Sequence, residues 1–240
     1  MRVYEVVYEP CVEACGYFAE LKAKFRYFHI EDCTNSFYLH LLERGWRRFG
    51  KEFLVPICEG CEACISIRYD CENFVFSKSH KRILKSPITL EIKRPWVSEA
   101  HISLHDKYHH CMHFKKGWKY RRTTPQYYYE TFVESFLDFG YEFDYYFEDK
   151  LIGVAYVDII DTEAISALYC YYDHDFSQYS IGTYSILKQI EIAKEYNIKY
   201  LYPGYWIKNH ISMGYKERFK PFEILCNRPS LEEIPLWVKE

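Results

Sequence analysis

Long apolar runs and secretion signals are missing from this chain of 240 residues. No stretch of about 18 apolar residues occurs, so we expect no membrane-spanning helix and no membrane partner. The first ten residues, MRVYEVVYEP, contain glutamates where a signal peptide needs an apolar core. These absences predict a cytoplasmic protein, in a compartment where thiols stay reduced.

Internal repeats at a solenoid period and low-complexity tracts are also missing, which excludes repeat architectures and disordered spacers. Apolar residues make up 49% of the chain and aromatic residues 20%. Such a composition is typical of a globular protein, and the length is sufficient for one large domain or two small ones with their own cores.

Charge is distributed unevenly, although the net charge is only −3. From Lys78 to Arg122 there are 12 Lys and Arg against 3 Asp and Glu, a local net charge of +9. From Glu130 to Asp175 there are 12 acidic residues against Lys150 alone, a local net charge of −11. The basic half indicates a surface for a polyanion, unless these blocks do not fold into separate faces.

Cysteine is abundant, with ten residues, and three of them lie in CEGCEAC at 58–64. Cys58, Cys61 and Cys64 have the CxxC spacing that lets thiolates from a tight turn reach one ion. A fourth ligand could come from Cys11 or Cys15, with Cys33 and Cys71 as further options. Zinc and an iron–sulfur cluster both suit four thiolates, and inert buried cysteines are the alternative.

The elements expected from periodicity are an α+β set with a boundary near residues 86–100. We predict a helix over 34–45 and, after the boundary, a helix over 124–140. Strands are expected at EFDYYFE, LIGVAYVDII and ISALYCYYD, with a turn at 149–150, then a helix over 182–196 and a strand at KYLYPGYW. This order is that of a GNAT-type acyltransferase domain.

One motif of that fold is missing. Acetyl-CoA-dependent members have a Q/R-x-x-G-x-G/A loop before this helix, whose amides hold the pyrophosphate. Here Gly182 follows Gln178 one residue late, and Tyr184 stands at the next small position. We therefore expect no acetyl-CoA as cofactor.

Four polar segments could carry chemistry. Paired arginines in GWRRFG suit a carboxylate or phosphate, and the basic run SKSHKR suits a phosphate backbone. The histidines of KYHHCMH at 107–113 could hold a metal or supply a base. Aromatic and cationic residues alternate from YLYPGYW to KERFK, a combination that binds single-stranded nucleic acid. For each segment, a solvated or core role is the alternative.

Eight segments, in order, resemble one family: the aminoacyl-tRNA–protein transferases of the arginyltransferase type, and within it the bacterial aspartate/glutamate leucyltransferases. They are CGYF at 15–18, LLERGWRRFG at 41–50, PICEGCEACISIR at 56–68, FSKSHKR at 76–82, SALYCYYD at 166–173, SIGTYSILKQI at 180–190, YLYPGYWI at 200–207 and MGYKERFKPFEIL at 213–225. The resemblance extends from about residue 10 to residue 226.

The resemblance implies an enzyme that moves leucine or arginine from charged tRNA to the α-amine of proteins beginning with Asp or Glu, marking them for N-end rule degradation. The aminoacyl ester is already activated, so no ATP is expected as a cofactor. DNA is not expected as a partner. The implied fold is two GNAT-like halves, which we place at residues 1–95 and 96–240. The alternative is a metal-stapled RNA-binding protein without catalysis.

The resemblance also implies site residues. The metal or cluster ligands are Cys15, Cys58, Cys61 and Cys64. The acidic N-terminus of the acceptor would meet Arg47, Arg48 and Arg82. The tRNA would meet Lys78, Lys81, Tyr205, Trp206, Lys208 and Lys216, and the possible catalytic bases are His110, Asp158 and Tyr215.

Overall fold

The structure is a computed structural model, and it describes residues 2–4, 13–134 and 138–240. Its helices are α1 (Asn35–Glu43), α2 (Lys78–Leu84), α3 (Glu99–Lys116), α4 (Pro125–Tyr128) and α5 (Ile181–Glu195). Its strands are β1 (Arg2–Tyr4), β2 (Glu13–Ala14), β3 (Lys22–Ala23), β4 (Phe25–Asp32), β5 (Arg47–Phe49), β6 (Glu52–Pro56), β7 (Ile65–Asp70), β8 (Thr89–Lys93), β9 (Gly140–Phe147), β10 (Lys150–Ile160), β11 (Ala164–Tyr172), β12 (Tyr200–Trp206), β13 (Phe222–Cys226) and β14 (Leu236–Lys239).

The fold class is α+β, as predicted, and its centre is an eight-stranded sheet in the order β14-β13-β7-β12-β11-β10-β9-β8. All neighbours in this sheet are antiparallel except β11 and β12. A second sheet has the order β1-β4-β6-β5, and β2 and β3 form a separate hairpin. No helix in the described ranges is both long and apolar enough to cross a membrane.

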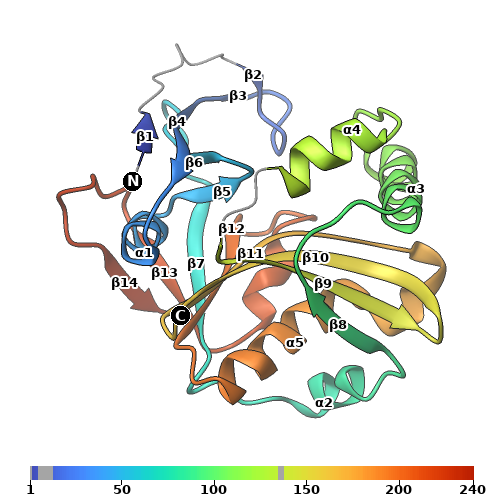
Figure 1. Cartoon of the computed structure of the whole chain (residues 1–240). Coiled ribbons are helices and arrows are strands. Elements are labelled where there is room, and N and C mark those ends of the chain that lie inside the picture. The colour runs from blue at the N-terminus through green and yellow to red at the C-terminus, as the bar shows by residue number, and fades with distance from the viewer. Residues whose placement is uncertain (1, 5–12, 135–137) are drawn as a thin grey trace.

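Helices cover both faces of the large sheet (Figure 1), with α3 and α4 on one side and α5 and α2 on the other. Alternation along β9 explains this arrangement, since successive strand residues point to opposite faces. Phe143 and Tyr145 enter the core beneath α5, whereas Tyr146 packs in the core beneath α3. Each face of this part of the sheet is therefore buried.

Most expected elements are confirmed. Thr34 caps α1 and Gly45 follows its end at φ +83. The three strands of the meander occur as β9, β10 and β11, and α5 buries Ile186, Leu187 and Ile190 as its spacing predicted.

Two expectations on helix and strand length are wrong. Thr124 and Pro125 do begin a helix, but α4 passes into a π-helical turn at Tyr129–Val133, and β9 already starts at Gly140. Phe136, which helical spacing places on the apolar face of the expected helix, lies outside the described residues. The alternation in ISIRYDCENFVF predicts a strand throughout, but the strand extends only as far as Asp70, and the basic run after it forms α2, with a capping box at Ser77.

The two halves of the sequence share the large sheet. Strands β7 and β8 precede residue 96, yet β7 lies between β13 and β12, and β8 forms the other edge beside β9. The boundary at residues 95 and 96 is therefore not a boundary between sheets, and the division into two folding units stays a prediction.

Strands β11 and β12 separate after a short parallel pairing. They pair only from Ala164 with Tyr200 to Ser166 with Tyr202. Pro203 comes next and has no N–H to continue a ladder, and the register between β12 and β7 shifts between Leu201 and Gly204. The resulting gap, called the fork below, opens between residues after Ser166 in β11 and after Tyr202 in β12.

Candidate active site

A cavity of about 1730 Å³ lies at the fork. The separated part of β11, from Ala167 to Cys170, forms one wall, and Pro203 of β12 and the loop from His210 to Phe219 form another. The end of α3, the start of α5, part of α2 and the β2–β3 hairpin complete the lining. Because α3 and α5 cover opposite faces of the sheet, the cavity borders elements of both faces.

Arg47 fills the apex of the fork. Its Nη2 donates to the carbonyl of Ala167 at 2.7 Å and its Nη1 to the carbonyl of Tyr202 at 3.3 Å. These carbonyls belong to the two strands that part here, so the guanidinium satisfies acceptors that lost their ladder partners. Burial lowers the pKa of Arg47.

Lys216 lines the cavity close to Arg47. It is 6% exposed, and its Nζ donates to the carbonyl of Tyr205 at 2.6 Å. A Cβ built on Gly204 would lie 3.5 Å from Lys216 Nζ and 3.6 Å from Arg47 Nη2. Gly204 has φ +91, so a side chain there would be strained and would meet both cations.

The charge of this pair is uncompensated. Neither Arg47 nor Lys216 has a carboxylate within 4.0 Å in the part of the chain that the structure describes. Burial and, to a smaller extent, the charge of Arg47 lower the pKa of Lys216 to about 7, against an opposite effect of Cys64. Two buried cations without a counter-ion favour an anionic ligand.

Arg48 and Asp158 are partners of each other. Arg48 Nη2 lies 2.6 Å from Asp158 Oδ1, Arg48 Nε lies 2.8 Å from Oδ2, and the hydroxyl of Tyr38 donates to Oδ2 at 2.7 Å. Both side chains are buried, and the bidentate geometry is that of a strong pair. Their predicted roles in acceptor binding and catalysis would require this pair to open.

The other predicted residues divide into three groups. Tyr215 lines the cavity beside Lys216, and its role as a catalytic base stays a prediction. Tyr205 and Trp206 are buried, the first donating to the carbonyl of Gly45 at 3.0 Å and the second packing on Phe222. The residues that are exposed and outside the lining of the cavity are Lys78, Lys81, Arg82, His110 and Lys208.

The four predicted cysteine ligands come from the β2–β3 hairpin and from the loop between β6 and β7. Burial, together with the neighbouring thiolates of Cys15, Cys58 and Cys61, raises the pKa of Cys64 to about 11, so the four lie in one neighbourhood. Backbone N–H groups of Tyr17 and Lys24 point at Cys15 Sγ and Cys58 Sγ. Cys11 lies outside the described residues.

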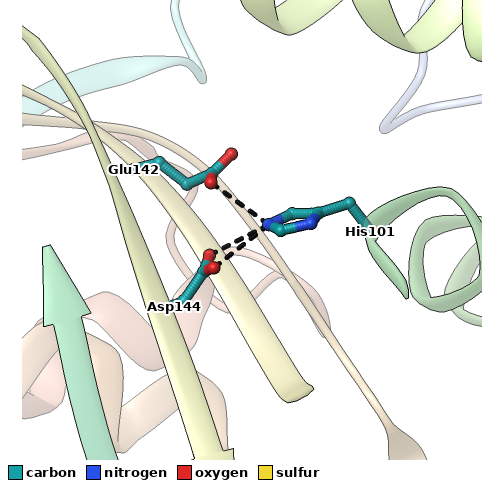
Figure 2. A group of neighbouring side chains, drawn as sticks. All are labelled: His101, Glu142 and Asp144. Atoms are coloured by element: carbon teal, nitrogen blue, oxygen red, sulfur yellow. Dashed lines mark hydrogen bonds and ion pairs between the residues drawn. The ribbon is translucent and has the colours of Figure 1, made fainter. Parts of the chain in front are cut away.

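A second cluster of ionisable groups lies beneath α3 (Figure 2). His101 Nε2 is 3.1 Å from Glu142 Oε1 and 3.1 Å from Asp144 Oδ2, and all three side chains are buried. It is the set of metal-binding side chains that the described residues bring within 4.8 Å. Lys93 Nζ lies 2.6 Å from Asp144, and Tyr156 donates to Glu142 at 2.9 Å.

Charge balance explains this cluster without a metal ion. Burial lowers the pKa of His101, but Asp144 and Glu142 outweigh it and raise the pKa to about 9. Protonated His101 and Lys93 then face two carboxylates. We interpret the group as the attachment of α3 to β9.

Sequence reasoning missed one segment at the mouth of the cavity. Residues 114–122, FKKGWKYRR, follow from α3 into the loop before α4, and all of them are exposed. Lys115, Lys116 and Trp118 line the cavity. The local charge count included this segment, but no motif marked it, since its aromatic spacing fits no regular element.

Comparison with solved structures finds a protein with a similar overall fold. FemX has a TM-score of 0.50 over 82% of this chain and 68% of its own, with 8% identity. At that identity only the overall fold is shared.

Sequence comparison is more specific. The model for the N terminus of arginine-tRNA-protein transferase matches residues 13–82, and the model for its C terminus matches residues 100–226. The aspartate/glutamate leucyltransferase of Helicobacter hepaticus is 52% identical, covering 99% of this chain and 98% of that protein. The enzyme of the same name from Campylobacter jejuni is 40% identical over 95% and 96%. The chain belongs to the arginine-tRNA-protein transferase family, as its motifs predicted.

Proposed function

We propose that this protein transfers leucine from charged tRNA to the α-amine of proteins that begin with Asp or Glu, marking them for degradation in the cytoplasm. The observation that carries the proposal is the match over 99% of the chain to a protein named for that activity. The relatives' name favours leucine over arginine as donor. The cavity at the fork supports the proposal, because it could hold the reacting ends of both substrates.

The reaction needs positioning more than activation. The α-amine nitrogen of the acceptor attacks the carbonyl carbon of the aminoacyl ester, a C–N bond forms, and the C–O bond to the terminal ribose breaks. The leaving ribose oxygen takes up a proton and becomes a hydroxyl, while the attacking amine loses one. An α-amine has a pKa near 7.7–8.0 and is partly neutral at cell pH. Holding both substrates at the fork therefore supplies much of the rate.

Arg47 and Lys216 would select the acceptor. An acidic side chain entering the cavity would place a carboxylate beside Lys216 and provide the counter-ion that the described residues lack. Arg47 would act from behind Gly204, holding the fork open and adding positive charge. A neutral acceptor residue would leave both cations buried and unpaired, which disfavours its binding.

Cys15, Cys58, Cys61 and Cys64 would hold a zinc ion or an iron–sulfur cluster. Four thiolates are a suitable donor set, and backbone N–H groups already point at two of the sulfurs. The bound group would join the β2–β3 hairpin, which borders the cavity, to the loop before β7. The fold of two GNAT-like halves is part of the same proposal.

A transfer assay tests the function. The metal-loaded protein is mixed with tRNA charged with labelled leucine or, separately, arginine, and with peptides beginning with Asp, Glu or Ala. Label from leucyl-tRNA in the Asp and Glu peptides, and none in the Ala peptide, is the expected result. No transfer from either donor by folded protein would favour the RNA-binding alternative.

A further inference from the structure

The exposed segment 114–122 combines positive charge and aromatic surface at one edge of the cavity. From Lys107 to Tyr129 the chain contains six Lys and Arg and no Asp or Glu. Five of these cations fall within eight consecutive residues, namely Lys115, Lys116, Lys119, Arg121 and Arg122. In the described ranges none of the five forms an ion pair with a carboxylate within 4.0 Å.

The aromatic side chains of the segment are exposed among these cations. Phe114 is 73% exposed, and Trp118 and Tyr120 are each 36% exposed. Trp118 and the neighbouring Lys115 and Lys116 also line the cavity, so the segment is continuous with the candidate active site.

The loop is held in place by its own contacts. Gly117 ends α3 at φ +68, and the ring of His113 bonds the carbonyl of Trp118 at 2.7 Å. Asp106 accepts a hydrogen bond from the hydroxyl of Tyr120 at 3.0 Å and another from the backbone N–H of Thr123 at 2.7 Å. These contacts order the loop that carries the aromatic rings, which lowers the entropy cost of binding.

We propose that the segment 114–122 binds the single-stranded 3′ end of the charged tRNA and guides it into the cavity. The inference rests on the proposed function and deepens it. Cations without carboxylate partners suit the phosphates, and exposed aromatic rings suit the faces of unstacked bases. Trp118 lies where the strand would pass from the surface into the cavity, with the aminoacyl ester ahead of it at the fork.

The rival surface is α2, to which the sequence assigned tRNA contacts. Its three cations, Lys78, Lys81 and Arg82, are exposed, but no exposed aromatic residue lies within the helix. A charge-only surface of this kind gives phosphate contact without base stacking. Three cations can be substituted on each surface, so the two can be compared directly.

The test uses a short fluorescein-labelled single-stranded RNA that ends as a tRNA does, titrated into the metal-loaded full chain at several salt concentrations. The rim variant combines Lys119→Gln, Arg121→Gln and Arg122→Gln. The rival variant combines Lys78→Gln, Lys81→Gln and Arg82→Gln in α2. A variant with Lys199→Gln and Lys239→Gln is a distant control. We expect the rim variant alone to reduce the slope of log Kobs against log salt, by about 2. Trp118→Ala should weaken binding about 10-fold to 100-fold.

The results separate this inference from the function itself. Unchanged RNA affinity and salt slope in the rim variant and in Trp118→Ala would overturn the inference, as would a loss confined to the α2 triple. Leucine transfer by the unmodified protein decides the proposed function independently. Circular dichroism on each variant checks that folding is intact, which exposed substitutions should leave unchanged.

Discussion

Two kinds of buried charge occur in this molecule, and they differ in compensation. Beneath α3, His101 and Lys93 face Glu142 and Asp144, and further along the sheet Arg48 faces Asp158. At the fork, the partners of Arg47 and Lys216 among the described residues are backbone carbonyls. A paired buried charge thus holds elements together, whereas an unpaired one beside a cavity is available to a ligand.

The largest effect is expected from breaking a compensated pair. Asp158→Ala would leave Arg48 buried without its carboxylate and should cost about 3–5 kcal/mol of unfolding free energy. Chemical denaturation measures this cost. A loss below about 1 kcal/mol would show that the pair does not stabilise the fold.

At the fork, removing a buried charge is expected not to lower the stability of the protein. Lys216→Met removes an uncompensated buried charge, so the protein should be as stable as before or more stable. The KM for Asp-starting peptides should rise on the order of 100-fold, because the acceptor carboxylate loses its cation. Transfer kinetics and denaturation on the same preparation check both. A normal KM together with reduced stability would show that Lys216 stabilises the fold and does not bind the acceptor carboxylate.

Adjacent residues in GWRRFG show why sequence alone could not make this distinction. Arg47 and Arg48 were predicted to share one role, but alternation along β5 sends them to opposite sides. Arg48 contacts Asp158, which lies 110 positions away in the sequence, and Arg47 contacts the fork. Periodicity predicted the meander, α1 and α5, since those signals are local.

The counter-ion of a buried arginine depends on tertiary contacts, so no local pattern marks it. Whether His110 or the loop at 114–122 lies beside the cavity depends on tertiary structure in the same way. His110 was a predicted catalytic base yet lies exposed outside the lining of the cavity, and the loop lines the cavity mouth without any motif.

A smaller effect is expected from pH. With a pKa of about 7 in the empty cavity, Lys216 loses its proton as pH rises past neutrality. The affinity for Asp-starting peptides should therefore fall several-fold between about pH 6 and pH 8. Lys216→Arg keeps its charge throughout this range, so its affinity should stay level. A parallel decline in both proteins would place the titrating group elsewhere.

A second effect of pH concerns the compensated cluster beneath α3. The folded pKa of His101 is about 9, above its ordinary value of 6.5, so its stabilising contribution is complete below pH 6.5 and disappears as pH rises through 9. The stability difference between the unmodified protein and His101→Gln should shrink over that window. Thermal denaturation at several pH values measures it, and a difference that grows with pH would contradict the raised pKa.

The most direct measurement is calorimetric titration of peptides beginning with Asp and with Asn into the unmodified protein and into Lys216→Met. The two peptides differ in one charge and have almost the same shape. We predict that the unmodified protein binds the Asp peptide at least about tenfold more tightly, and that Lys216→Met binds both equally. An unchanged preference for Asp in Lys216→Met would show that the acidic side chain is recognised elsewhere.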